Sequence, residues 1–305
     1  MKKIFLFGAL MIALTLSLPA QVSSSTDLIV QLSSLPEAKL NLNQSWTVPV
    51  LQGNSALTKA NSLKLNINAE LTPIDTNLGV DAVLTPIAFL QFGLGAKMGS
   101  GWNIELLGNP LYGIGISKSG ADKKQVLVQD SAFGGLYWNV HGSALFQFDL
   151  AALMPGDYNH IVFQTKHEIS YKAFTAAKER ESWVYEHDFA ENQNGWNYYG
   201  MFLLGYQPPL FLNTVGLMAE VNTYLYNTPG GEQWGESQGR WIFSLLTNFT
   251  LMRNVTLALI GQMRTMRNYT DATQDLYYQN RLLTTADPIR FEWYRVALIL
   301  AVKLF

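Results

Sequence analysis

Residues 136–150, LYWNVHGSALFQFDL, alternate between two kinds of side chain. Trp138, Val140 and Phe146 are apolar, whereas His141 and Ser143 are polar, and each kind recurs at every second position. A period of two places the two kinds on opposite faces of a β-strand. The run exceeds the ~9 to 11 residues with which a strand crosses a bilayer, so we expect this strand to extend beyond a membrane.

The same alternation returns along most of the chain and favours a barrel. From position 38, Leu40, Leu42 and Trp46 share one face, while Lys39 and Asn41 share the other. The chain is 48% hydrophobic and 14% charged, against roughly 25% charge in soluble domains. No internal segment has the ~18 uninterrupted apolar residues of a spanning helix. Because backbone groups in lipid must pair with one another, we predict an all-β, transmembrane, antiparallel up-and-down β-barrel.

The first twenty residues predict an export signal. Lys2 and Lys3 precede an apolar stretch at 4–16 and a small-residue end at Ala20, after which we expect cleavage. Cysteine is absent, which excludes a lipid-modified amino terminus and disulfides. The net charge of −2 argues against nucleic acid as a partner. The sequence has no metal-ligand spacing and no nucleotide motif, so we expect no metal and no cofactor.

The number of strands depends on a change of phase at Pro73. Apolar residues occupy odd positions before it, as at Leu65, and even positions after it, as at Leu78. Either a tight turn at Thr72 and Pro73 separates two strands, or one strand carries a β-bulge there. Short and long connectors alternate without a break only if 62–84 is a single bulged strand. We therefore expect ten strands, with twelve as the alternative.

This count divides the chain into a signal peptide at 1–20, a periplasmic lead at 21–36 and a barrel at 37–305. Both termini then lie in the periplasm, where connectors are short, and the longer connectors lie outside. The expected external connectors are 51–61, 99–130, 175–194, 226–238 and 267–289.

Six of the eight tryptophans support this arrangement, since aromatic rings collect where hydrocarbon meets headgroups. All six fall on the lipid phase, and we expect them near the external ends of strands as one girdle. They are Trp46, Trp102, Trp138, Trp196, Trp241 and Trp293. The other two, Trp183 and Trp234, fall in external loops.

The last strand, from about Arg290, ends at Phe305 with Phe291, Trp293 and Ile299 in the same phase. Here the chain resembles the general class of bacterial outer-membrane β-barrels, which are porin-like in form, although Lys303 interrupts the apolar series. The resemblance covers the whole chain after the signal and indicates no specific family. It implies residence in the bacterial outer membrane, contact with its lipid, and recognition of the final strand by the barrel-assembly machinery.

The inward phase carries ionisable groups of both signs, which either neutralise one another as a plug or line a conducting path. Besides Asp75, Lys97 and Glu292, the lumen-facing candidates are Lys39, Lys64, Glu70, Asp81, His141, Asp149, His160, Lys166, Glu168, Lys172, Glu220, Arg240 and Arg264.

The hairpin around 154–157 allows pairs to be predicted. If paired indices sum to about 309, Asp149 faces His160, Ser143 faces Lys166, and His141 faces Glu168. A carboxylate beside a histidine raises the imidazole pKa, so the last pair could form a pH-dependent gate.

Enzyme function receives little support. His167 falls on the lipid phase, as in outward-facing outer-membrane phospholipases, but Ser170 has the opposite phase. The chain has no Asp-x-Asp or Asp-x-His as in omptin proteases, only adjacent His187 and Asp188. The loops at 178–188 and 230–236 combine charged and aromatic residues, which suits binding to sugars or proteins.

These observations favour a narrow, non-enzymatic outer-membrane channel or transport-related barrel for small polar solutes. The alternative is a closed structural or surface-binding barrel that acts through its external loops.

Overall fold

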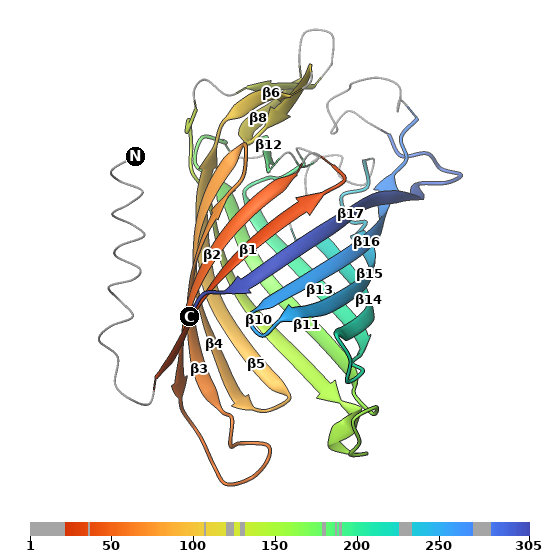
Figure 1. Cartoon of the computed structure of the whole chain (residues 1–305). Coiled ribbons are helices and arrows are strands. Elements are labelled where there is room, and N and C mark those ends of the chain that lie inside the picture. Colours follow the sequence, from red (N-terminus) through yellow and green to blue (C-terminus); the bar gives the residue numbers. More distant parts are fainter. Residues whose placement is uncertain are drawn as a thin grey trace.

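The computed structural model shows a closed barrel of antiparallel strands (Figure 1). It describes residues 22–305 except 36, 107, 120–124, 129–131, 179–180, 187, 189–190, 226–233 and 271–281, so the signal-peptide prediction lies outside the described residues. Twelve strands follow one another round the wall in chain order. They are β1 (Ser23–Ser33), β2 (Ala38–Pro49), β3 (Ser62–Leu71), β4 (Asp75–Ile87), β5 (Leu90–Gly101), β10 (Tyr137–Asp149), β11 (Ile161–Phe174), β13 (Gly195–Tyr206), β14 (Leu212–Tyr224), β15 (Arg240–Met252), β16 (Val255–Arg267) and β17 (Ile289–Lys303).

The predicted ten strands are therefore wrong, and the alternative of twelve is correct. Two segments account for the difference. Ser23–Ser33, expected in a periplasmic lead, is strand β1, which hydrogen-bonds to β2 on one side and to β17 on the other. Residues 62–84, expected as one bulged strand, lie in two strands joined by a turn at 72–74.

Thr72 builds this turn. Its backbone N–H donates to the carbonyl oxygen of Asp75 at 2.9 Å. Its hydroxyl oxygen accepts from the backbone N–H groups of Ile74, at 3.1 Å, and Asp75, at 3.0 Å. Pro73 suits the second position of such a turn because it lacks an N–H and presets its backbone angle. The phase change in the sequence thus marks the end of one strand and the start of the next.

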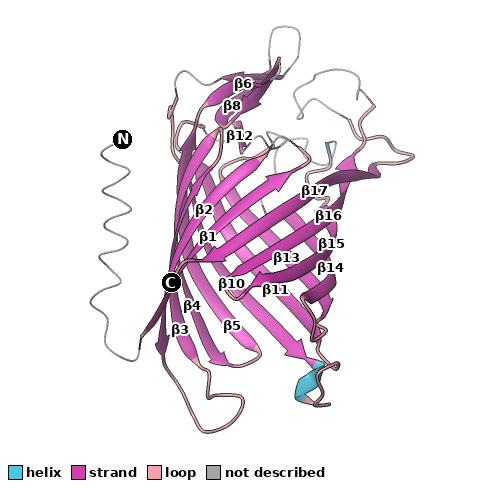
Figure 2. Ribbon diagram, viewed as in Figure 1, coloured by secondary structure: helices cyan, strands magenta, loops and turns pink. Residues whose placement is uncertain are grey.

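The two ends of the barrel differ. One, the loop end, carries the connectors at 34–37, 72–74, 102–136, 175–194, 225–239 and 268–288. The other, the turn end, carries both ends of the described chain, the turns at 88–89, 207–211 and 253–254, and the short helix η1 (Leu150–Ala152), seen at the bottom of the barrel in Figure 2. The connector at 51–61, expected outside, lies at the turn end. Counting β1 and dividing 62–84 into two strands adds two strands in all. The long connectors after β5 therefore remain together at one end of the barrel, as predicted.

Residue parity sets the two faces of the wall. Large apolar side chains are exposed on the outside, among them Leu65, Val80, Leu94, Val140, Ile169, Leu204, Leu217 and Leu245. The expected antiparallel barrel with an apolar outer face is confirmed. Among the described residues, no helix is long and apolar enough to cross a membrane.

Short strands gather over the loop end. They are β6 (Asn103–Leu106), β7 (Asn109–Tyr112), β8 (Ile114–Ser119), β9 (Gln125–Val128) and β12 (Ser182–Tyr185). β12 pairs with β8, which pairs with β9. Ile114, Tyr137, Phe174, Trp183 and Tyr185 form a buried apolar cluster that anchors this layer to the barrel rim. The β12 segment of this layer is thereby held against the mouth of the lumen.

Candidate functional site

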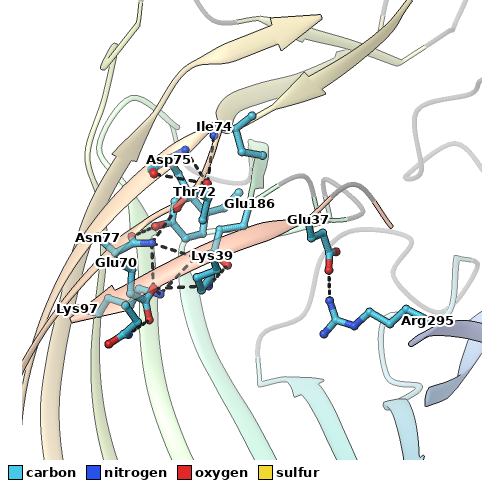
Figure 3. Close-up of polar contacts among 12 residues, drawn as sticks. Glu37, Lys39, Glu70, Thr72, Ile74, Asp75, Asn77, Lys97, Glu186 and Arg295 are labelled. Atoms are coloured by element: carbon cyan, nitrogen blue, oxygen red, sulfur yellow. Dashed lines mark hydrogen bonds and ion pairs between the residues drawn. The ribbon is translucent and has the colours of Figure 1, made fainter. Parts of the chain in front are cut away.

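Two lysines and two glutamates form one ion-paired group inside the barrel, which we call the constriction cluster (Figure 3). Lys39 lies on β2, Glu70 on β3 and Lys97 on β5, whereas Glu186 follows β12. Lys97 Nζ lies 2.8 Å from Glu70 Oε2 and 3.3 Å from Glu186 Oε1. Lys39 Nζ lies 3.2 Å from Glu186 Oε2 and 3.6 Å from Glu70 Oε2. Each charge thus touches both opposite charges.

Neutral groups complete the network. The Asn77 amide on β4 donates to Glu70 Oε2 at 3.3 Å, Glu186 Oε1 at 3.1 Å and Asp75 Oδ1 at 3.0 Å. The Tyr185 hydroxyl donates to Asn77 Oδ1. Tyr185 also stacks on Tyr137, with ring centroids 4.1 Å apart. Residues 182–186, which we call the loop tip, are therefore tied to the wall by rings, an amide and two ion pairs.

Glycine makes room for the loop tip. A Cβ atom at Gly99 on β5 would overlap Asn77 Oδ1 and the Tyr185 hydroxyl. Glu186 has a left-handed backbone angle, φ 51°, which is uncommon outside glycine. Its N–H donates to the Gly113 carbonyl at 2.9 Å, and Gly113 in turn packs against the Ile74 carbonyl too closely for a Cβ. Strained backbone persists only where its surroundings enforce it, so docking of Glu186 is strongly specified.

Electrostatics keep Glu186 ionised. Burial alone would raise its pKa, but the ammonium groups of Lys97 and Lys39 outweigh burial and hold the pKa of Glu186 below its ordinary value. Burial, reinforced by the charge of Glu186, raises the pKa of Tyr185, so this hydroxyl stays protonated and acts as a donor. The loop tip thus presents a fixed negative charge to the two lysines at neutral pH.

The constriction cluster lies between two cavities. A cavity of about 660 Å³ opens toward the loop end and is lined by Lys39 and Glu186 among others. A cavity of about 290 Å³ lies deeper in the lumen and is lined by Glu70 and Lys97 together with Asn41, Asn68 and Asp81. We call them the loop-end cavity and the mid-barrel cavity. The cluster thus borders both cavities and lies at the boundary between them.

The pairs expected around 154–157 are partly present. Asp149 Oδ2 lies 2.7 Å from His160 Nδ1 near the turn end, as predicted. The other two pairs are wrong, because paired indices in this hairpin sum to 311 rather than 309. Lys166 instead contacts Glu168 on its own strand at 2.8 Å.

His141 does not face Glu168. Its Nε2 lies 2.9 Å from Asp81 Oδ1 on β4, although β5 separates the two strands. Gly95 on β5 permits this contact, since a Cβ there would overlap both side chains. The pH-dependent gate expected from a His141–Glu168 pair therefore lacks its partner.

The remaining lumen candidates are spread over the inner wall rather than gathered at one site. Glu220 accepts from the Tyr199 hydroxyl at 2.6 Å, and Arg264 Nη2 lies 2.8 Å from Glu292. Arg240 Nη2 lies 3.3 Å from Glu191 in the loop after β12. Lys64 lies on the inward phase of β3, and Lys172 lies on the inward phase of β11.

Five of the six tryptophans expected in the girdle lie toward the loop end, and Trp46 does not. Trp138, Trp196, Trp241 and Trp293 lie in the halves of their strands nearest the loop end, and Trp102 directly follows β5. Trp196 and Trp293 are 50% and 57% exposed. Trp46 lies near the turn end instead, because β2 runs from the loop end to the turn end once β1 is counted.

His167 lies on the outer face and is fully partnered. Its Nδ1 lies 2.7 Å from the Tyr198 hydroxyl, and its Nε2 lies 3.1 Å from the Thr165 hydroxyl. Ser170 is buried on the opposite side of the wall. Ser170 therefore does not share the outer face with this histidine.

Sequence reasoning missed the most important member of the site. Glu186 fell within a loop considered for external binding, and nothing in its spacing relates it to Lys39 or Lys97. Asn77 was on the correct phase but is neutral and was not singled out. The tip of the other candidate binding loop, 230–236, lies mostly outside the described residues. In the described part of the chain, no group of three or more His, Cys, Asp or Glu residues could hold a metal ion.

Comparisons with known proteins concern the barrel. No family model and no curated protein matches the chain. Similar solved structures include the NanC porin (TM-score 0.41, 7% identity, covering 92% of this chain and 100% of that one). Another is the β domain of the Bordetella autotransporter BrkA, with a TM-score of 0.39 and 10% identity, covering 92% of this chain and 98% of that one. A third is CdiB from Acinetobacter baumannii, with a TM-score of 0.33 and 9% identity, covering 93% of this chain and 60% of that one. All three are outer-membrane β-barrels, the general class that the sequence resembles.

Proposed function

We propose that the protein is a narrow outer-membrane channel for small polar solutes, constricted by the cluster of Lys39, Glu70, Lys97 and Glu186. The apolar outer face fits lipid, and the charged inner face fits water and polar solutes. The turn end, which carries both ends of the described chain, would face the periplasm, and the loop end, which carries the longest connectors, would face outward.

One observation carries the proposal. The loop tip narrows the lumen through contacts that are ionic and hydrogen-bonded, with Glu186 as the charged member. Rings of charged side chains at a narrow point are a common basis for selectivity in channels. The two cavities on either side supply space for hydrated solutes before and after the cluster.

Conductance in planar bilayers tests this proposal. Glu186→Gln removes the charge that draws the loop tip onto Lys39 and Lys97, so we expect single-channel conductance to rise by roughly twofold. Glu105→Gln is the matched control, because Glu105 is an exposed carboxylate in β6, one of the short strands over the loop end. It should conduct like wild type.

The alternative, a closed barrel acting through its loops, predicts a different result. Its supporting observation is the charge balance of the constriction cluster, which holds two cations and two anions in direct contact. Absence of conductance in wild type and in Glu186→Gln alike would overturn the channel proposal and favour this alternative.

A further inference from the structure

Lys172 and Tyr137, which line the loop-end cavity, are donors whose protons have no acceptor among the described residues. The cations lining this cavity are Lys39, Lys172, Arg264 and Arg295. Lys39 is held by Glu70 and Glu186, Arg264 by Glu292, and Arg295 by Glu37. Within the described part of the chain, Lys172 alone of these four has no hydrogen bond or ion pair.

The nearby carboxylates do not compensate Lys172 by contact. Glu168, four residues earlier on β11, is bound by Lys166 at 2.8 Å. Asp188 accepts from the Tyr185 N–H at 3.2 Å and from the Asn192 amide. The negative charges of Glu168 and Asp188 act on Lys172 only at a distance, as do the positive charges of Arg240 and Lys97. An ammonium group inside a barrel that has only distant partners is costly, and a bound anion would remove that cost.

The second donor is the Tyr137 hydroxyl. Tyr137 is 6% exposed and lines the same cavity. Its oxygen accepts from the Asn139 amide at 3.3 Å, but its own proton has no acceptor among the described residues. In the β10–β11 pairing, Asn139 faces Lys172 and Tyr137 faces Phe174. Tyr137 and Lys172 are therefore diagonal neighbours on the inner face, a spacing within reach of long side chains.

We propose that Lys172 and Tyr137 form a subsite for the carboxylate of a small organic monoanion. A carboxylate has two acceptor oxygens, one for the ammonium group and one for the hydroxyl. Asp75, Glu186 and Asp188 line the same cavity and disfavour a second negative charge on the ligand. This inference rests on the proposed channel function and names the class of solute that the loop-end cavity holds before the constriction cluster.

Equilibrium binding to the purified, detergent-solubilised barrel tests the subsite without requiring conductance. The probes are benzoate and gluconate, with benzamide as the uncharged counterpart of benzoate, and Trp183 in the cavity lining provides a fluorescence readout. We expect Lys172→Gln to weaken binding of the anions by roughly tenfold or more, and Tyr137→Phe by a smaller factor. Benzamide should bind weakly to all forms.

Lys59→Gln serves as the control for charge, because Lys59 lies in the 51–61 connector at the turn end. It should bind the anions like wild type. If neither anion shows binding that depends on Lys172, or if benzamide binds as well as benzoate, the subsite is wrong. If binding depends on Lys172 but no form conducts, the subsite stands and the channel proposal fails.

Discussion

At the scale of single residues, glycine positions decide which polar side chains can meet inside the wall. Along β5, Gly95 lets His141 reach Asp81, and Gly99 lets Asn77 meet Tyr185. Gly95 and Gly99 are four residues apart in β5, so they lie on the same face of the strand. The sequence could not show which side chains from neighbouring strands would occupy the space, because that depends on register.

Gly99→Ala should release the loop tip. The added methyl group overlaps the Asn77–Tyr185 contact, so we expect a loss of about 1 to 3 kcal/mol in docking stability. The measurement is the rate of proteolytic cleavage in 175–194, which should rise. Gly142→Ala on the outer face is the control, since its Cβ would lie at an ordinary 3.5 Å from Leu94. Equal cleavage rates in both variants would contradict the role given to Gly99.

Residue parity also explains the end of the chain. The register between β16 and β17 shifts after Gln262, so Tyr294 of β17 has no partner residue on β16. Phe291 and Trp293 face outward before it, whereas Ile299 and Lys303 share the inward phase after it. The expected common phase of Trp293 and Ile299 is therefore wrong, and Lys303 faces Asp27 of β1 across the pairing instead of interrupting an apolar face.

At the scale of elements, alternation predicts the barrel strands from β10 onward, but two features of the wall do not follow from it. β1 is rich in serine and was assigned to a lead, and the β3–β4 turn was assigned to a bulge. The error at Pro73 comes from treating connector length as decisive. A turn of three residues at 72–74 is compatible with the loop end because Thr72 supplies its hydrogen bonds. Local chemistry overrode the usual difference between the two ends.

The loop tip should respond to acid through Glu186. Its pKa is lowered in the folded protein, so its ion pairs add stability above the ordinary carboxyl pKa of about 4.3. That stability is lost as the pH falls through the lower folded value. We expect the docked state to be insensitive to this group between pH 5 and 8, and conductance to rise at more acidic pH.

Glu186→Gln separates this response from titration of the other carboxyl groups. It lacks the titrating carboxyl group, so its conductance should change less on acidification than that of wild type. An equal rise in both proteins would show that another group controls the loop tip.

At the scale of the whole molecule, closure between β1 and β17 distinguishes twelve strands from ten. Ile29 faces Ala301 of β17 on one side and Asn41 of β2 on the other. In a ten-strand barrel Asn41 and Ala301 would lie on adjacent strands. Here β1 separates them, which places them roughly 10 Å apart.

Engineered cysteines test this closure in a chain that has none of its own. The pair Ile29→Cys with Ala301→Cys should form a disulfide under mild oxidation, because facing residues of adjacent strands meet the geometric requirement. Asn41→Cys with Ala301→Cys should remain reduced. Gel mobility with and without reductant reports both, and efficient bridging of the second pair would disprove the twelve-strand closure.

The seam between β1 and β17 has a consequence for biogenesis. Thr26 donates to the carbonyl of Phe305 and accepts from the N–H of Leu304, so the earliest and latest parts of the folded wall are immediate neighbours. During synthesis, β1 emerges long before its second partner and must wait with one edge unpaired. A nascent chain stopped before β17 would present two open edges, which are templates for aggregation. Closure of the sheet therefore waits for β17, the last strand of the wall.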